Sequence, residues 1–353
     1  MNKRQKKLNN NSNDDEQSAE IQFNLGNQFK KQDILSKAEF HYRKAILLNL
    51  NHFEANKNLG LLLLDQDNLT EAEFFLKKAL KIVPKESETL YTLAIVLFNQ
   101  GKEEEAEIYY RKVLAINPKS NDAHVNLGII LFNKGDYKEA EFHYKKAIEI
   151  NPTDNEAYDS LAIIYYNQGR VDEAENYYKK AIKVNSNNCE AHINLGVLFK
   201  NQGKFKEAKF HFSEAIKIDP QDCETHINLA YILEKLDRVK DSENHLKKAI
   251  VIDPLDFEAH YRLANLYFTQ NNFDKAVIHF RKAIKINPKC RKSHSKLGFI
   301  YLKNNQIDKA VVHFSKGIEN GLNKDNNNDN NTKKSILTIS DGDKRKTRGS
   351  YKL

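Results

Sequence analysis

The sequence predicts an all-helical solenoid built from nine copies of one helical hairpin, and two observations indicate this fold. The first is a period of 34 residues that superimposes every proline of the chain. These prolines are Pro84, Pro118, Pro152, Pro220, Pro254 and Pro288, and Ser186 takes the place of a seventh. The second is that hydrophobic residues, 40% of the chain, recur at fixed places within each period. A period of this length is typical of repeat solenoids, in which each unit packs on its neighbours.

The repeats begin at residue 19, and we number the places within each of them from 1 to 34. They span 19–52, 53–86, 87–120, 121–154, 155–188, 189–222, 223–256, 257–290 and 291–322. The flanking segments, 1–18 and 323–353, are polar, rich in Asn and without this period. Such a composition cannot bury enough apolar area to offset chain entropy, so we expect both segments to be disordered.

Each repeat divides into two amphipathic helices, which we call helix A and helix B. In repeat 121–154, helix A carries Leu127, Gly128 and Leu131 at places 7, 8 and 11, which share one helical face. Place 15 is always Gly, Asp or Asn, the residues that tolerate a left-handed backbone, so we expect the chain to turn there. Helix B follows with a small residue at place 20 and an aromatic residue or Leu at place 24, and the proline at place 32 is expected to end it.

These residues resemble the tetratricopeptide repeat. In repeat 121–154 the family pattern is matched by Leu127, Gly128, Leu131, Ala140, Tyr144 and Pro152. The main departure is place 4, where the Trp of the family pattern is replaced by Gln, Asn, Leu, Tyr or His. The resemblance implies a right-handed superhelix whose concave side, formed by the A helices, binds extended peptides.

Charge and cysteine usage exclude several classes of protein. The net charge is +8, but residues 1–18 carry +1 and residues 323–353 carry +4, which leaves +3 for the repeats. This balance argues against a broad phosphate-binding surface. The three cysteines have neither zinc-ligand nor disulfide-framework spacing. No run is apolar enough for a membrane span and no secretory signal is present, so we expect a cytoplasmic or nuclear protein.

Catalytic and cofactor motifs are not found in the sequence. Eleven of the twelve histidines recur at places 4 and 23, as expected for framework residues rather than a singular catalytic or metal-binding group. Phosphate loops, nucleophile elbows and metal-protease motifs are missing as well. We therefore predict a protein without enzymatic activity, cofactor or metal.

A recurring amide at place 6 of helix A is the candidate partner-binding feature. The residues at this place that we expect to contact a partner are Asn24, Asn58, Asn126, Asn194, Asn228, Arg262 and Lys296. Asn is a mediocre helix former, and the packing of the two helices within a hairpin does not require an amide at this place. A row of amides can bind a peptide backbone, because each offers one donor and one acceptor. The alternative is a set of merely solvated polar residues.

This amide row resembles the superhelical arm of the O-linked N-acetylglucosamine transferases. Only thirty-one residues follow Leu322, too few for a sugar-nucleotide-binding domain, so the resemblance implies no activity. Towards the C-terminus the concave side turns basic, through Arg262, Lys292, Lys296 and Lys303. These cations either form a solvated face or dock an acidic part of a ligand.

The expected function is that of a non-catalytic scaffold holding protein partners, as extended segments, without a small-molecule substrate or a membrane. One alternative is a targeting subunit for an enzyme on another chain, such as a glycosyltransferase, and a further one is nucleic-acid binding through the tails. Short basic clusters in both tails, Lys3 to Lys7 and Lys344 to Arg348, resemble nuclear-import patches. The last repeat is eroded, and the apolar cluster Ile336, Leu337 and Ile339 either covers it or acts as a linear motif.

Overall fold

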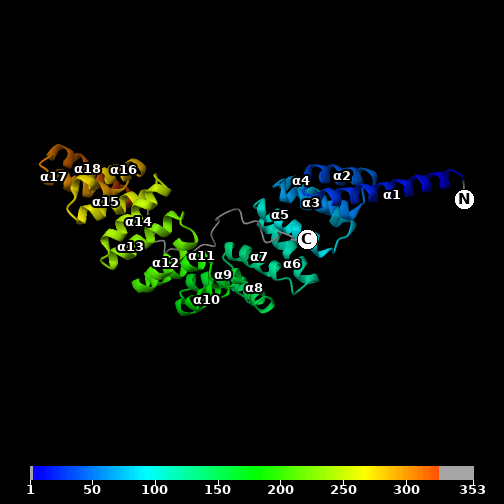
Figure 1. Cartoon of the computed structure of the whole chain (residues 1–353), viewed down its shortest axis with the longest axis horizontal. Helices are drawn as coiled ribbons and strands as arrows, with labels where there is room; N and C mark the ends of the chain where they lie inside the picture. Colours follow the sequence, from blue (N-terminus) through cyan, green and yellow to red (C-terminus); the bar gives the residue numbers. More distant parts are fainter. Residues whose placement is uncertain (1–2, 326–353) are drawn as a thin grey trace. The chain divides into compact units, whose positions relative to one another are not determined.

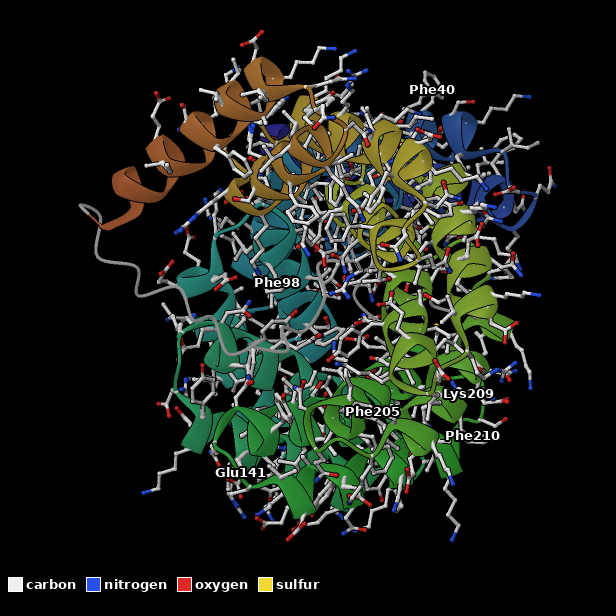
Figure 2. The ribbon with its side chains drawn as sticks, turned by 90° about the vertical axis from the view of Figure 1, so that its left-hand side faces the viewer. Phe40, Phe98, Glu141, Phe205, Lys209 and Phe210 are labelled. Atoms are coloured by element: carbon white, nitrogen blue, oxygen red, sulfur yellow. The ribbon has the colours of Figure 1, made fainter. Side chains whose placement is uncertain are left out.

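The computed structural model describes residues 3–325, and the side chains of residues 15–319 within them. This part of the chain contains eighteen α-helices and no strand (Figure 1). The helices of the first four repeats are α1 Lys3–Lys31, α2 Leu35–Leu48, α3 Phe53–Asp65, α4 Leu69–Ile82, α5 Ser87–Asn99, α6 Glu103–Ile116, α7 Asn121–Asn133 and α8 Tyr137–Ile150. The others are α9 Asn155–Asn167, α10 Val171–Val184, α11 Cys189–Asn201, α12 Phe205–Ile218, α13 Cys223–Lys235, α14 Val239–Ile252, α15 Phe257–Thr269, α16 Phe273–Ile286, α17 Arg291–Lys303 and α18 Ile307–Asp325.

Two compact units make up the described chain, residues 3–157 and residues 158–325. Within each unit, successive helices pack against one another in sequence order. The odd-numbered helices are the predicted A helices and the even-numbered ones the predicted B helices. From α3 to α17 every helix A begins at place 1 of its repeat, so the predicted nine-hairpin solenoid is confirmed.

The turn between helix A and helix B has the predicted left-handed residue at place 15 in every repeat. Glycines hold this place in four repeats, with φ between 72° and 81°. The other five repeats use Asp33, Asp67, Asp237, Asn271 and Asn305, with φ between 56° and 59°. Short polar side chains can hydrogen-bond locally and therefore tolerate this region of backbone space.

Close approach of the two helices depends on the small residue at place 8. A Cβ atom built on Gly128 would lie 2.8 Å from a ring carbon of Tyr144, which is fully buried. The leucines at place 7 are buried as well; Leu127 and Leu161 are each 0% exposed. The core therefore repeats with the sequence, and each hairpin contributes one layer to it.

Proline is not required to end helix B. In the repeat that carries Ser186 instead, α10 still ends at Val184, and the N–H of Asn185 donates to the carbonyl of Ala181. Asn151, which precedes a proline, makes the equivalent bond to Ala147. Where no further repeat follows, and Leu322 takes the proline's place, α18 continues to Asp325.

The first helix begins earlier than expected. Order was predicted from about Ala19, whereas α1 already begins at Lys3. Residues 3–18 contain no Gly or Pro that would interrupt a helix, and they extend helix A of the first repeat in the N-terminal direction. At the other end, 323–325 belong to α18, while the basic cluster near Lys344 and the cluster at Ile336 lie outside the described residues.

Candidate functional site

Place 6 of helix A does not form the uniform row of free amides that the sequence suggested. Asn126 and Asn194 are buried, with exposures of 8% and 5%. Asn58, Asn228, Arg262 and Lys296 are partly buried, and Asn24 is exposed. The candidate residues thus differ in what they can offer to a partner.

Several of these amides are engaged inside the protein. The side-chain N–H of Asn126 donates to the hydroxyl of Tyr91 in the preceding repeat, at 3.0 Å. That of Asn58 donates to Oδ1 of Asn27 at 3.1 Å, and Asn24 donates to Glu20 at 3.3 Å. The argument that packing needs no amide at place 6 is therefore wrong for Asn126, because packing between successive repeats uses it.

Asn194 differs from Asn126 in lacking such a bond. Its Nδ2 atom is buried without a hydrogen-bond partner, although the residue is only 5% exposed. An unpaired buried amide is costly in a folded protein. It is also closed to a partner in this arrangement, so we do not include Asn194 in the candidate site.

In residues 158–325, two place-6 residues, Asn228 and Lys296, are contacted by place 12 of the preceding helix A. Lys200 of α11 donates a 2.7 Å hydrogen bond to Oδ1 of Asn228 on α13. Two repeats later, the Nζ atom of Lys296 on α17 lies 4.2 Å from the ring centre of Phe268 on α15. Lys200 and Phe268 are not among the residues predicted from the sequence, although the spacing of 28 residues that joins places 12 and 6 points to both.

Arg262 lies between these two contacts and has several partners. Its Nε atom is 2.6 Å from Oε1 of Glu258, one helical turn earlier. Its guanidinium lies 5.1 Å from the ring centre of Tyr231 on α13, a cation–π distance. Arg262 therefore packs between an acidic side chain of its own helix and an aromatic ring of the preceding helix A.

Burial changes the pKa of two groups next to Arg262. The pKa of Lys200 is lowered, first by desolvation and then by the positive charge of Arg262. Desolvation raises the pKa of Glu234 on α13, although Arg262 opposes that rise. Both shifts indicate that water is partly excluded around Arg262.

A pocket of about 260 Å³ opens beside Arg262, between α13, α15 and α17. Its lining residues are Glu234, Phe257, Glu258, Tyr261, Arg262, Asn265, Cys290 and Lys292. The pocket brings together two of the predicted basic residues, Arg262 and Lys292, and adds acidic, amide and aromatic groups that the sequence analysis did not select. It contains hydrogen-bond donors and acceptors side by side.

The histidines have the structural role that their spacing predicts. In five repeats the imidazoles of places 4 and 23 meet through their Nδ1 atoms, at 2.8 Å for His124 and His143. His124 also donates from Nε2 to the carbonyl of Pro118, which leaves its Nδ1 as the acceptor. His143 must then donate from its own Nδ1. Burial, followed by the charge of His124, lowers the pKa of His143 to about 4.

All three cysteines are free and partly buried. The thiol of Cys189 donates to the carbonyl of Ala215 at 3.6 Å, and desolvation raises its pKa to about 11. The thiol of Cys223 likewise donates to the carbonyl of Ala249, and desolvation raises its pKa to about 11. Within residues 15–319, no group of three or more His, Cys, Asp or Glu side chains is placed to hold a metal ion. No helix among the described residues is both long and apolar enough to cross a bilayer.

The fold and these contacts define a solenoid of paired helices with a side-chain pocket on its A helices. Models named tetratricopeptide repeat match residues 51–119, 122–154, 143–176, 189–222 and 257–290. A further model, named TPR repeat, matches residues 163–203. The matches together cover more than half of the chain, so the chain belongs to the tetratricopeptide repeat family.

Solved structures with similar folds include other repeat proteins. PilF of Pseudomonas aeruginosa is 20% identical, with a TM-score of 0.54 over 60% of this chain and 97% of that one. The C-terminal part of a TPR repeat-containing protein from Cytophaga hutchinsonii is 18% identical, with a TM-score of 0.56 over 68% of this chain and 98% of that one. MamA from Desulfovibrio magneticus is 23% identical, with a TM-score of 0.45 over 48% and 97%. A comparison with curated proteins gave no match.

Proposed function

We propose that this protein is a non-catalytic scaffold that binds an extended peptide segment of a partner protein across α13, α15 and α17. Tetratricopeptide repeats mediate protein–protein interaction, and family membership supports that general role. The observation that carries the more specific proposal is the pocket beside Arg262. In residues 158–325 it is the place where predicted binding residues and a cavity coincide.

The chemistry of the pocket suits a peptide main chain. A peptide bond carries one donor and one acceptor, so a site for it must offer both. Arg262 and Lys292 donate, Glu234 and Glu258 accept, and the amide of Asn265 does both. Phe257 and Tyr261 add aromatic surface for a side chain. A site for a bare anion would not contain two carboxylates.

Three lysines of α17 favour a ligand with an acidic residue next to the bound segment. Among the described residues, no ion pair involves Lys292, Lys296 or Lys303, whereas Arg262 is already paired with Glu258. Two of the three, Lys296 and Lys303, lie over the rings of Phe268 and Phe273 instead of meeting a carboxylate. A carboxylate of the ligand would give these cations a partner of opposite charge.

The test compares partners captured from native lysate by the full chain and by the double variant Arg262→Ala, Lys292→Ala. The matched control is Lys248→Ala, Lys282→Ala, which removes two positive charges from exposed B-helix positions of the same unit. Circular dichroism first establishes that the three forms are equally folded. We expect the pocket variant alone to lose the partners, and peptide arrays of those partners to map binding to acidic segments.

Equal capture by all three forms would refute binding at this pocket. Capture of an intact enzyme through the pocket would support the alternative role as a targeting subunit. If both double variants weakened capture equally, and if added salt abolished it, the partners would be bound by charge alone and not by the pocket.

A further inference from the structure

The last repeat exposes apolar residues that are covered in the repeat before it. Phe268, Phe273, Val277 and Ile284 of the eighth repeat are partly buried, and they pack against a core that includes Leu297, Ile300 and Tyr301 of α17. Helix A of each following repeat thus covers one face of the repeat before it. The equivalent positions of the ninth repeat, 34 residues later, are Leu302, Ile307, Val311 and Ile318, and we call them the terminal face.

No described segment covers the terminal face. Leu302 is 50% exposed, Ile307 62%, Val311 56% and Ile318 61%. Single exposed apolar residues are normal in proteins, but four of them at the positions that pack against the core in the eighth repeat indicate a missing contact. The sequence keeps apolar residues at all four places, although no helix follows α18 among the described residues.

We propose that the segment Ser335–Ile339 of the same chain, SILTI, docks on the terminal face. Within residues 323–353 this is the one cluster of aliphatic residues, and its Ile336, Leu337 and Ile339 supply the side chains that a covering segment needs. Apart from Gly342, Gly349, Tyr351 and Leu353, the remainder of that tail is polar or charged. The proposal does not depend on peptide binding at the Arg262 pocket.

The chain between the end of α18 and this segment is long enough. The nine residues 326–334 span roughly 30 Å when extended. The 19-residue helix α18, from Ile307 to Asp325, is about 28 Å long. The segment can therefore return along α18 as far as Ile307.

Covalent attachment favours the same arrangement. The charges around the segment balance, because Lys333 and Lys334 precede it and Asp341 and Asp343 follow it. A tethered segment also has a high local concentration, of the millimolar order for a short flexible linker, which a second copy of the chain does not reach at ordinary protein concentrations. For this reason we assign the face to the chain's own tail rather than to a neighbouring molecule.

Hydrogen exchange in the full chain tests the proposal. The tail variant Ile336→Ser, Leu337→Ser, Ile339→Ser keeps the length and charge of the chain, and Lys333→Ala, Lys334→Ala is the control next to it. We expect amides of α17 and α18 to exchange about tenfold faster in the tail variant and unchanged in the control, because uncovering the face weakens local stability. A synthetic peptide of residues 333–343, added in excess, should restore the slow exchange.

A face variant completes the design. Val311→Ser should speed exchange in the same helices. Combining it with the three tail substitutions should have little further effect, since both sets of changes remove the same contact. Unchanged exchange in the tail variant would overturn the proposal. A second outcome would also overturn it. If diluting the protein removed both the protection of α17 and α18 and a dimer detected by light scattering, the face would be covered by a second copy of the chain.

Discussion

The Nζ atom of Lys200 on α11 donates a 2.7 Å hydrogen bond to Oδ1 of Asn228 on α13, 28 residues further along the chain. The residues occupy places 12 and 6 of successive repeats. Because desolvation lowers the pKa of Lys200, its ammonium depends on this acceptor more than a solvated lysine would. A residue at place 6 is thus matched to the one at place 12 before it.

Removing the acceptor should destabilise residues 158–325. We expect Asn228→Leu to lower the free energy of unfolding by about 1.5–3 kcal/mol, the usual cost of a lost hydrogen bond to a charged group. Lys200→Met should cost less, because the apolar stem is retained. In a double-mutant cycle measured by urea unfolding, Asn228→Leu should become nearly harmless once Lys200 is Met; additive effects would mean that the bond contributes nothing.

Place 15, at the turn between helix A and helix B, should accept Asn with a smaller loss of stability than Ala. Gly135 has φ of 81°, and an added Cβ would meet nothing within 4 Å, so a substitution there changes only the backbone energy. We expect Gly135→Ala to cost about 1–2 kcal/mol. Gly135→Asn should cost clearly less, since Asn271 and Asn305 adopt the same turn. Thermal unfolding of the two variants measures the difference, and equal melting temperatures would contradict the strain argument.

The histidine pairs should make stability fall at acidic pH. The pKa of His143 is about 4 in the folded protein, below its ordinary value of 6.5, so the unfolded chain binds more protons between these values. The contribution of His143 to the free energy of unfolding is fully present above pH 6.5 and is lost as the pH falls towards 4. For each such histidine the free energy of unfolding changes by at most about 1.4 kcal/mol per pH unit.

Urea unfolding between pH 4.5 and 7.5 isolates the contribution of one pair. His143→Gln keeps a side-chain amide for the contact with His124 but removes the titrating group. The variant should therefore show a shallower dependence of stability on pH than the unchanged protein. Parallel curves would show that His143 does not titrate differently in the folded and unfolded states.

Leu161→Ala should weaken the fifth repeat, which is also the repeat without the proline. Leu161 is fully buried, and we expect a loss of about 2–5 kcal/mol from the lost contacts and the cavity. Since a repeat array is held together by contacts between neighbours, we also expect the thermal transition to separate into two steps. Leu47→Ala, at a position 79% exposed, is the control. A single transition with an unchanged midpoint would contradict both expectations.

The sequence predicted the hairpins well because their determinants are local. Leu127, Gly128 and the turn residue Gly135 lie within one repeat, and helical periodicity alone places them on one face or at one turn. The hydrogen bond of Asn126 could not be predicted in this way, because its partner Tyr91 lies 35 residues earlier, in the preceding repeat. That contact depends on how far one repeat is displaced along the next, and a single hairpin does not contain this information.

The same limit applies to the pocket and to the chain ends. Arg262 and Lys292 were selected for their charge, but Glu234 and Tyr261 line the pocket only because three A helices converge there. At the N-terminus, composition suggested a disordered segment, whereas the uninterrupted backbone from Lys3 to Lys31 forms one helix. Low hydrophobicity predicts little tertiary contact, but it does not prevent helix formation.

The pairing of place 12 with place 6 also bears on how nine nearly identical hairpins find their correct order. Their apolar faces are interchangeable, so hydrophobic contact alone scarcely distinguishes the right neighbour from a more distant one. The polar pairs do distinguish them: if the repeat of Lys200 docked against that of Lys296, two ammonium groups would face each other in place of a lysine and an amide. We therefore expect these pairs to favour the native neighbours, so that shuffling whole repeats should produce misfolded chains even though every core position is preserved.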